Sequence, residues 1–306
     1  MSTSQDRANE LRFPFGFRSL LSVWKLLFLE RGAFQPDASK TSEWNRGAYL
    51  VEGLGHCGAC HTPRNLLGAE KKREYLAGGE AEGWHSPALN AASPSPVPWT
   101  GEQLQKYLAS GLVDEHAITA GLMAPVVHNL SAVPEQDLRS IAAYLATIAG
   151  PPGADRQKKS QDALARAKRD IAAYPSVPGG ASNGEAAKNN RSGELIYAGT
   201  CAACHDRGRE TTSEGALHLS LGTVMTIPTS ANLIRIIMSG ISPEQGEAGR
   251  FMPAYANELT DGQIRDLVTY IRAHFGQAPA WPDVEAEIKK AREELREANV
   301  KRSGGS

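Results

Sequence analysis

The stretch GHCGACHTPRNLL at residues 55–67 holds two cysteines separated by two residues, with a histidine directly after the second cysteine. A variant of this cluster, CAACH, returns at residues 201–205. The two clusters contain all four cysteines of the 306-residue chain, so none is left for a disulfide elsewhere; they are Cys57, Cys60, Cys201 and Cys204. The first question is therefore what each cluster binds.

The CxxCH spacing is typical of the covalent attachment of a c-type haem. Two thiols about one helical turn apart can add to the two vinyl groups on one edge of a porphyrin. The histidine that follows, His61 or His205, is then placed under the ring, where its imidazole binds the iron. We therefore predict two covalently bound c-type haems.

Two other chemistries use CxxC pairs. A zinc site needs four ligands, often from two such pairs brought together, but the pairs here lie in different halves of the chain and each has its own histidine. A thioredoxin-like dithiol would need a surrounding βαβ pattern, which the sequence does not show. Both alternatives are less favoured than haem.

Length and composition set broad limits. A chain of 306 residues suggests about two domains, and 41% hydrophobic residues are enough for ordinary cores. The net charge of -1 gives no reason to expect nucleic acid or an anionic membrane surface as a partner. No apolar run is long enough to span a bilayer.

An internal repeat places two methionines in equivalent positions. TGEQLQKYLASG (100–111) aligns with TSANLIRIIMSG (229–240), and extending this alignment without gaps brings Met123 onto Met252. Each methionine is next to a proline or one residue from it, in what we expect to be a loop between helices. The other methionines have no such repeat partner.

The repeat extends to the helices on either side. LRSIAAYL (138–145) and IRDLVTYI (264–271) each place apolar residues at i, i+3, i+4 and i+7, which predicts one buried helix face. RGAYLV (46–51) resembles SGELIY (192–197), and each predicts a short helix leading into CxxCH. The order helix, CxxCH, variable loop, helix, methionine loop, helix therefore occurs twice.

This order resembles the class I cytochrome c domain, found twice, at roughly 43–150 and 185–276. The resemblance implies an all-α fold of two tandem domains, each wrapping one haem with a histidine and a methionine as axial ligands. These ligands would be His61 with Met123, and His205 with Met252. His128 is the alternative to Met123 that remains open.

Histidine and methionine ligation has a functional consequence. A thioether is a soft ligand that favours ferrous iron and so raises the reduction potential. With both axial positions filled, the iron has no open site for a substrate. The resemblance therefore implies electron transfer rather than oxygen or peroxide chemistry.

Several loop residues of the first domain are candidates for its haem pocket. Trp84, Pro87 and Trp99 lie in an insertion that the second domain lacks, and ordinary loop packing is the alternative for them. Arg64 follows the cysteine cluster and could pair with a haem propionate, or be a solvated surface arginine.

Segments outside the two domains differ in composition. The sequence predicts that the region 151–184 joins the two domains. It contains a charged, exposed helix over 154–173, and a flexible linker rich in Pro, Gly, Asn and Ser follows over 174–193. The tail 277–306 contains a second charged helix over 283–300. Its apolar stripe is thin, so we expect a solvated helix, although docking on this chain or on a partner is open.

Residues 1–42 form an aromatic N-terminal connector. Arg18 and Lys25 interrupt its apolar run and no small-residue cleavage site follows, so the segment does not fit a signal peptide. It is too short for a transmembrane helix. Residues 11–29 could instead lie in a membrane interface, or pack on another domain or subunit.

A narrower resemblance involves this connector. FPFGFRSLLSVWKLLFL (13–29), followed by 43–71, is similar to the middle of the cytochrome subunits of membrane-associated bacterial dehydrogenases. These include quinoprotein alcohol and gluconate dehydrogenases, and molybdenum hydroxylases such as nicotinate and isoquinoline dehydrogenases. Such subunits commonly carry three haem domains behind a signal peptide. This chain resembles them from the connector onward, which implies either a truncated chain or a two-haem form whose targeting is supplied otherwise.

The resemblance implies a periplasmic, membrane-associated electron-transfer subunit rather than an enzyme. It would accept electrons from the catalytic subunit of a dehydrogenase and pass them to a respiratory acceptor such as a cytochrome, an oxidase or a quinone. A freely diffusing dihaem shuttle is one alternative. A dihaem peroxidase is another, and it would require a displaceable ligand at one iron.

Overall fold

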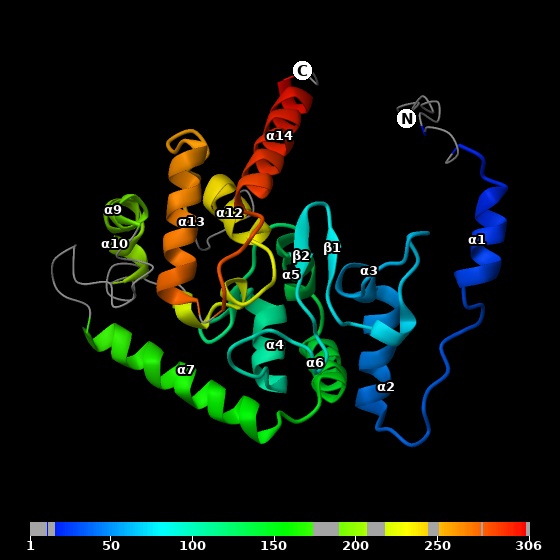
Figure 1. Cartoon of the computed structure of the whole chain (residues 1–306). Coiled ribbons are helices and arrows are strands. Elements are labelled where there is room, and N and C mark those ends of the chain that lie inside the picture. Colours follow the sequence, from blue (N-terminus) through cyan, green and yellow to red (C-terminus); the bar gives the residue numbers. More distant parts are fainter. Residues whose placement is uncertain are drawn as a thin grey trace.

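The computed structural model describes residue 11 and residues 16–173, 190–206, 218–243, 251–276 and 278–303. The described chain is dominated by helices, and Figure 1 shows them in two groups joined by a long helix along one side. The all-α prediction is confirmed, with two short antiparallel hairpins added to it. Within the described residues, no helix combines the length and the apolar character that crossing a membrane requires.

The first group is built around a crossing of two helices. α2 (Ser42–Tyr49) packs across α6 (Glu135–Ala149), and α4 (Gly101–Ser110) packs on the other side of α6. At the crossing, a Cβ on Gly47 would lie only 2.8 Å from the Cβ of Tyr144. A residue without a side chain is therefore needed here, because it lets the two backbones approach closely.

Shorter elements complete the first domain. They are η1 (Leu50–Leu54), α3 (Gly58–His61), η2 (Lys72–Glu74), β1 (Gly79–Ala81), β2 (Trp84–Ser86), β3 (Leu112–Val113), β4 (Ala117–Ile118) and α5 (Met123–Ser131). In the β1–β2 hairpin, Glu80 lies opposite His85 and Ala81 opposite Trp84. The turn residues Glu82 and Gly83 both have positive φ, as a two-residue type I′ turn requires.

The second group repeats this plan. α9 (Arg191–Thr200) crosses α13 (Asp261–Phe275), and a Cβ on Gly193 would lie 2.7 Å from the Cβ of Tyr270. The remaining elements are α10 (Ala202–His205), η3 (Leu219–Leu221), η4 (Thr223–Met225) and α12 (Ala231–Ser239). Tyr144 and Tyr270 hold equivalent places in the repeated stretches 138–145 and 264–271, and each lies against the crossing glycine of its own domain.

Local signals explain where the repeated helices begin and end. Thr100 caps α4 and Thr260 caps α13, each in a capping box with the glutamine three residues later. The repeated glycines Gly111 and Gly240 end α4 and α12 with φ of 73° and 69°. The left-handed region favours glycine, so the sequence repeat at these two positions has a backbone cause.

Helix α7 (Ala154–Ala173) has the predicted bounds, but it is not fully exposed. Ala163 and Ala167 are buried against Val97 of the first domain and Leu221 of the second. The predicted linker of residues 174–193 lies mostly outside the described residues. Its end was predicted wrongly, since α9 already begins at Arg191 after the Asn190 cap.

The prediction of a solvated helix over 283–300 was wrong. α14 (Val284–Ser303) packs on α12 and α13, and Val284, Ile288 and Ala291 are buried. Its thin stripe is sufficient because polar contacts add to it. Asp283 accepts hydrogen bonds from Ser230, and Glu287 and Glu294 pair with the buried Arg235.

Candidate haem sites

The first CxxCH lies on a short helix that follows η1. Cys57 is the N-cap of α3, and the His61 amide donates to the Cys57 carbonyl at 3.0 Å. One helical turn therefore separates the two thiols, as the attachment chemistry requires. Neither Cys57 nor Cys60 is in a disulfide, and burial raises the pKa of the Cys57 thiol.

The His61 imidazole is held by the segment after β2. Its Nδ1 lies 2.7 Å from the carbonyl oxygen of Pro87. Because a carbonyl can only accept, Nδ1 carries the proton and Nε2 keeps its lone pair for a metal. Burial lowers the pKa of His61, which favours the neutral, ligating form. The predicted place of Pro87 at the first site is thus supported.

The backbone around His61 is tightly packed. The Gly78 amide donates to the His61 carbonyl at 2.8 Å. A Cβ on Gly79, the first residue of β1, would lie 2.5 Å from the carbonyl oxygen of Cys60. The β1–β2 hairpin is therefore anchored directly on the cysteine cluster.

The same hairpin reaches the methionine segment. Gly121 has φ of 56°, and a Cβ there would collide with the indole ring of Trp84. Two residues later, Met123 is half-buried and packs against the same core cluster as Cys57. Strand β2 and the residue after it therefore connect the methionine side of the site, through Trp84, with the histidine side, through Pro87.

The expected loop position of Met123 was wrong, because Met123 is the first residue of α5. Pro125 lies in the first turn of this helix. Backbone N–H groups there have no partner within the helix, so the missing N–H of proline removes no helical hydrogen bond. His128 lies further along α5 and is exposed. Of the two alternatives, Met123 is half-buried and packs against the core cluster that Cys57 also contacts.

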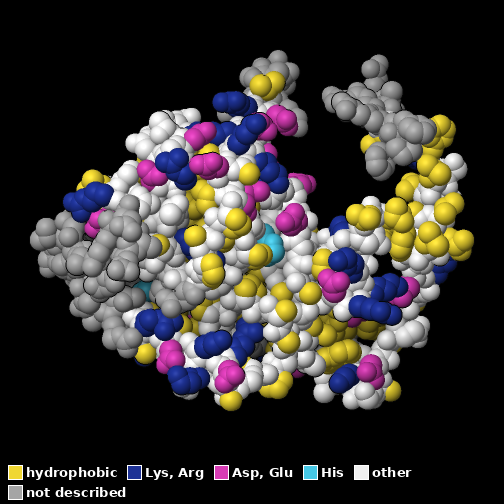
Figure 2. Space-filling view, viewed as in Figure 1, with side chains coloured by type: hydrophobic (Ala, Val, Ile, Leu, Met, Phe, Trp, Pro, Cys, Tyr) yellow, Lys and Arg dark blue, Asp and Glu magenta, His cyan; other side chains and the backbone are white. Residues whose placement is uncertain are grey.

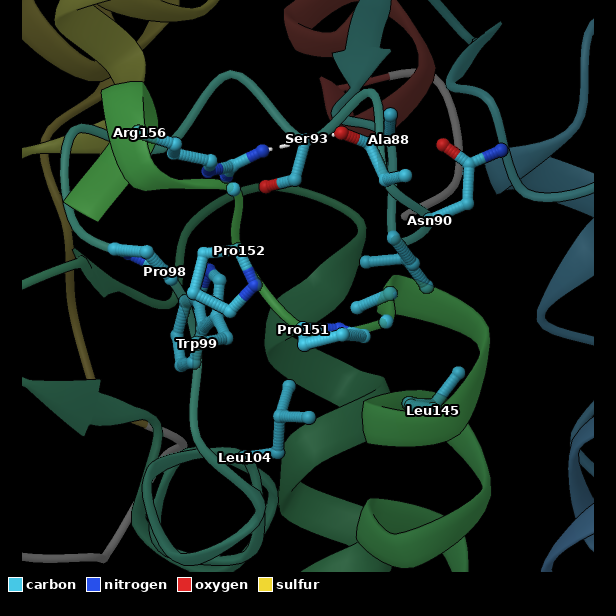
Figure 3. Close-up of a pocket in the computed structure, with 15 residues that line it drawn as sticks. Ala88, Asn90, Ser93, Pro98, Trp99, Leu104, Leu145, Pro151, Pro152 and Arg156 are labelled. Atoms are coloured by element: carbon cyan, nitrogen blue, oxygen red, sulfur yellow. Dashed lines mark hydrogen bonds between the residues drawn. The ribbon is translucent and has the colours of Figure 1, made fainter.

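Trp99 and Arg64 make contacts that the sequence did not indicate. Trp99 stacks on the buried His116, with ring centroids 3.8 Å apart. It also lines a cavity of about 150 Å³ with Leu104 and Leu145, between α4, α6 and the start of α7 (Figure 3). Arg64 donates to the carbonyls of Gly68 and Ala59, so it braces the loop after the cysteine cluster.

The second CxxCH is built in the same way. Cys201 caps α10, and the His205 amide donates to the Cys201 carbonyl at 2.9 Å. Burial raises the pKa of Cys201. Residues 207–217, which follow the cluster, lie outside the described residues.

Met252 is brought to this second cluster by two sets of contacts. Its backbone pairs with Ile241, just after α12, through two hydrogen bonds of 2.9 and 2.8 Å. Tyr255 donates from its hydroxyl to the carbonyl of Thr200, directly before Cys201, at 3.3 Å. Burial, together with the nearby thiols, raises the pKa of Tyr255. Met252 and Cys201 pack against one core cluster.

The donors present fit c-type haem better than zinc. Each CxxCH packs in its own domain with its own methionine. Among the described residues, no three His, Cys, Asp or Glu side chains converge on one point. In the first site, the orientation of His61 is already fixed by a backbone carbonyl, as is usual for a ligating histidine.

Sequence reasoning missed the β1–β2 hairpin, which it treated as an inserted loop. The hairpin supplies both the carbonyl that holds His61 and the ring that meets Gly121. A signal was present in the sequence. Glu82-Gly83 is a two-residue turn ending in glycine, as short hairpins use, but Gly79, Glu80 and Ala81 before it are residue types that strands disfavour, so the signal was weak.

Comparison with known proteins defines the class. Residues 188–271 match the family described as cytochrome c oxidase, cbb3-type, subunit III. Over these residues the chain is similar to a cytochrome c domain, and each of its two helical CxxCH clusters lies on a core that also holds a methionine. This similarity to a cytochrome c domain supports an electron-transfer role.

Three relatives narrow this class. A nicotinate dehydrogenase subunit of Pseudomonas putida is 38% identical over 93% of this chain and 22% of the relative. The fructose dehydrogenase cytochrome subunit of Gluconobacter japonicus is 31% identical over 92% of this chain and 59% of the relative. A diheme cytochrome c-type protein of Cereibacter sphaeroides is 41% identical over 48% of this chain and 49% of the relative. The resemblance to the cytochrome subunits of bacterial dehydrogenases is confirmed, and the chain spans only part of the length of these relatives.

Proposed function

We propose that this chain binds two covalent c-type haems and transfers electrons for a dehydrogenase. In this proposal Cys57, Cys60, Cys201 and Cys204 form the thioether links. His61 and Met123 ligate the first iron, and His205 and Met252 the second. The observation that carries the proposal is the repetition of one constellation, a helical CxxCH and a methionine on the same core cluster, in two domains.

Bound at these sites, each haem would supply one-electron chemistry by cycling its iron between the ferrous and ferric states. The chain supplies position and environment. The Pro87 carbonyl fixes the ring of His61 and raises its basicity as a ligand. The methionine thioethers would favour the ferrous state, and each methionine packs against an apolar core cluster.

The ligand assignment is tested by replacing Met252 with leucine. The potential of one haem should fall and its methionine–iron absorption band should disappear. The matched control is Met238→Leu, because Met238 is a buried core methionine without a repeat partner. If Met252→Leu keeps both the band and the potential, Met252 is not a ligand. The same experiment with Met123→Leu and His128→Ala decides between the two candidates at the first site.

A tightly associated subunit is favoured over a diffusing shuttle because of helix α1 (Leu20–Phe28). None of its residues is buried, and Leu26 and Leu27 are 79% and 64% exposed. Figure 2 shows hydrophobic side chains gathered over this helix. A shuttle would need this segment folded back on its own domains, whereas an exposed apolar patch usually marks an interaction site.

The exposed patch lies next to the first haem site. Trp24 donates to the carbonyl of Leu67 at 2.9 Å, and Lys72 pairs with Glu30. Leu66 and Leu67, in the loop after the first CxxCH, are themselves exposed. We propose that this region contacts the catalytic subunit of a periplasmic dehydrogenase, the electron donor. Peripheral membrane contact through 11–29, which includes α1, is the alternative use of the same surface. A respiratory cytochrome, oxidase or quinone would be the acceptor.

Gentle purification from native membranes and periplasm, with mass spectrometry of the proteins that travel with the chain, tests the partner. A dehydrogenase catalytic subunit that co-purifies in a fixed ratio to this chain supports the proposal, and the active site of that subunit would identify the class of substrate. A chain that elutes alone with two haems supports the shuttle instead. Rapid binding of carbon monoxide to the reduced protein would favour a peroxidase-type enzyme over both.

A further inference from the structure

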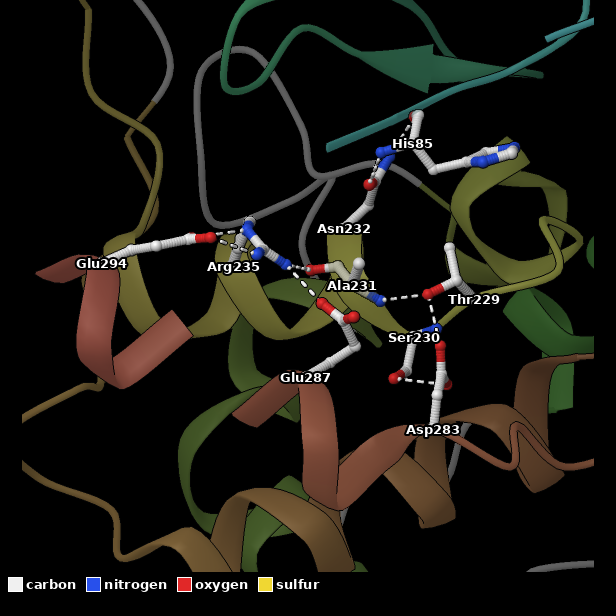
Figure 4. A network of polar contacts seen from close by, with 9 residues as sticks. All are labelled: His85, Thr229, Ser230, Ala231, Asn232, Arg235, Asp283, Glu287 and Glu294. Carbon is white, nitrogen blue, oxygen red and sulfur yellow. Dashed lines mark hydrogen bonds and ion pairs between the residues drawn. The ribbon is translucent and has the colours of Figure 1, made fainter. Parts of the chain in front are cut away.

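The side-chain amide of Asn232 links the two domains by hydrogen bonding to the backbone of strand β2. The His85 amide donates to Oδ1 of Asn232, and Nδ2 of Asn232 donates to the His85 carbonyl, both at 2.8 Å (Figure 4). Asn232 on α12 of the second domain therefore pairs with the middle residue of β2 as a neighbouring strand would. Aspartate could not replace it, because the pairing needs a donor and an acceptor on one side chain.

The tip of the same hairpin rests on a rigid part of the second domain. A Cβ on Gly83 would lie 2.5 Å from Nη2 of Arg235 and 2.7 Å from Oε1 of Glu294. Arg235 is buried and cannot easily move, since it is paired with Glu287 at 3.0 Å and Glu294 at 2.9 Å. The hairpin is thus fitted against α12 and α14 at two points.

Each side of this contact leads to one of the candidate sites. On the first-domain side, His85 is two residues before Pro87, whose carbonyl accepts from the His61 imidazole. On the second-domain side, the end of α12 holds the Met252 segment. The Tyr255 amide donates to the Ile237 carbonyl at 3.0 Å, and Met252 pairs with Ile241. Short runs of backbone and these hydrogen bonds therefore connect His61 with Met252 continuously.

We propose that the contact of the β1–β2 hairpin with α12 is the junction through which electrons pass between the two domains, and that Asn232 and Gly83 are its positioning residues. This inference rests on the proposed pair of haems. With haems bound at the two sites, one electron would pass from a reduced haem at one site to an oxidised haem at the other, so the step would need no further oxidant or reductant. No covalent bond is made or broken and no proton is transferred.

The first test replaces Asn232 with alanine, which removes both hydrogen bonds to β2. After rapid partial reduction by a pulse of reducing radicals, the two haems should equilibrate several-fold more slowly than in the unchanged protein. The potential and the axial-ligand bands of each haem should stay the same, because Asn232 contacts neither cluster. Ser239→Ala is the control, since Ser239 is exposed at the other end of α12. An unchanged rate in Asn232→Ala would overturn the inference.

The second test compares two glycines of equal backbone strain. Gly83 has φ of 81° and Gly68 has φ of 77°, but only Gly83 would bring a Cβ against another domain, while Gly68 faces open space. Both alanine variants carry the same left-handed penalty. We expect Gly83→Ala to slow the equilibration and Gly68→Ala to leave it unchanged. Equal rates in the two variants would show that the hairpin tip does not set the junction.

Failure of this inference can be told apart from failure of the proposed function. Mass spectrometry of the unchanged chain counts the covalent haems before any rate is measured. If the chain has two haems with histidine and methionine bands, and neither variant alters their equilibration, the junction lies elsewhere while the proposed function stands. If only one haem is attached, the proposed function fails first.

Discussion

Replacement of Gly193 by alanine tests the helix crossing on which the second domain is built. Gly193 is buried in α9 where this helix meets α13. An added Cβ would lie 2.7 Å from the Cβ of Tyr270, and still closer to the Asp266 carbonyl oxygen. Because real Cβ atoms essentially never approach below 3.0 Å, the two helices must move apart.

The size of the effect follows from two opposing contributions. Overpacking of a close-packed contact costs about 1–3 kcal/mol. Alanine in place of glycine within a helix recovers about 0.5–1 kcal/mol. We therefore expect Gly193→Ala to lower the free energy of unfolding by about 1–2 kcal/mol.

Gly199 provides the matched control in the same helix. It is exposed, and a Cβ there meets nothing within 4 Å. Gly199→Ala should therefore have the higher helix propensity of alanine without the steric clash, and raise the free energy of unfolding by up to about 1 kcal/mol. The assay is urea unfolding followed by far-ultraviolet circular dichroism. A Gly193→Ala variant as stable as Gly199→Ala would refute the close crossing.

Three further predictions concern other parts of the fold. Gly47→Ala should destabilise the first domain through the equivalent crossing, while Gly53→Ala, whose Cβ would meet only one atom at 4.0 Å, should not; urea unfolding again separates them. Ile288→Ala should cost about 2–5 kcal/mol of unfolding free energy, because Ile288 on α14 is buried where this helix packs on α12 and α13, and limited proteolysis should then cleave α14 sooner. Burial lowers the pKa of His116 from 6.5 to about 4, so the unfolded chain binds more protons between these values. The contribution of His116 to the free energy of unfolding should therefore be fully present above pH 6.5, and about 3 kcal/mol of it should be lost as the pH falls toward 4. His116→Gln should remove this slope in urea unfolding measured across the pH range, and a slope that persists would assign it to other groups.

Much of the candidate sites could be predicted because their signals are local or repeated. CxxCH is a one-turn motif, and the helix periodicity of 138–145 and 264–271 identified the faces that now pack on α2 and α9. The pairing of Met123 with Met252 came from the repeat, and each methionine packs against the core cluster that a cysteine of its own CxxCH also contacts. The helix position of Met123 was missed, because the Pro125 that follows it suggested a loop.

Errors arose where docking depends on a surface elsewhere in the chain. α14 was expected to be solvated, since only a few apolar residues line one of its faces. Its docking depends on the buried Arg235, whose partners Glu287 and Glu294 looked like ordinary surface charges in the sequence. Sequence periodicity describes one helix at a time, so it cannot show that Arg235 on α12 forms ion pairs with these carboxylates of α14.

The sequence by itself determined the two CxxCH clusters, the repeated positions of Met123 and Met252 and the all-α class, because these depend on spacing within a turn or on repetition of one pattern. Only the tertiary structure decided that β2 pairs with Asn232, that Pro87 holds His61, and that α14 covers α12. Those contacts join segments far apart in the chain. They depend on complementary shape and hydrogen bonding between surfaces, which no single stretch of sequence contains.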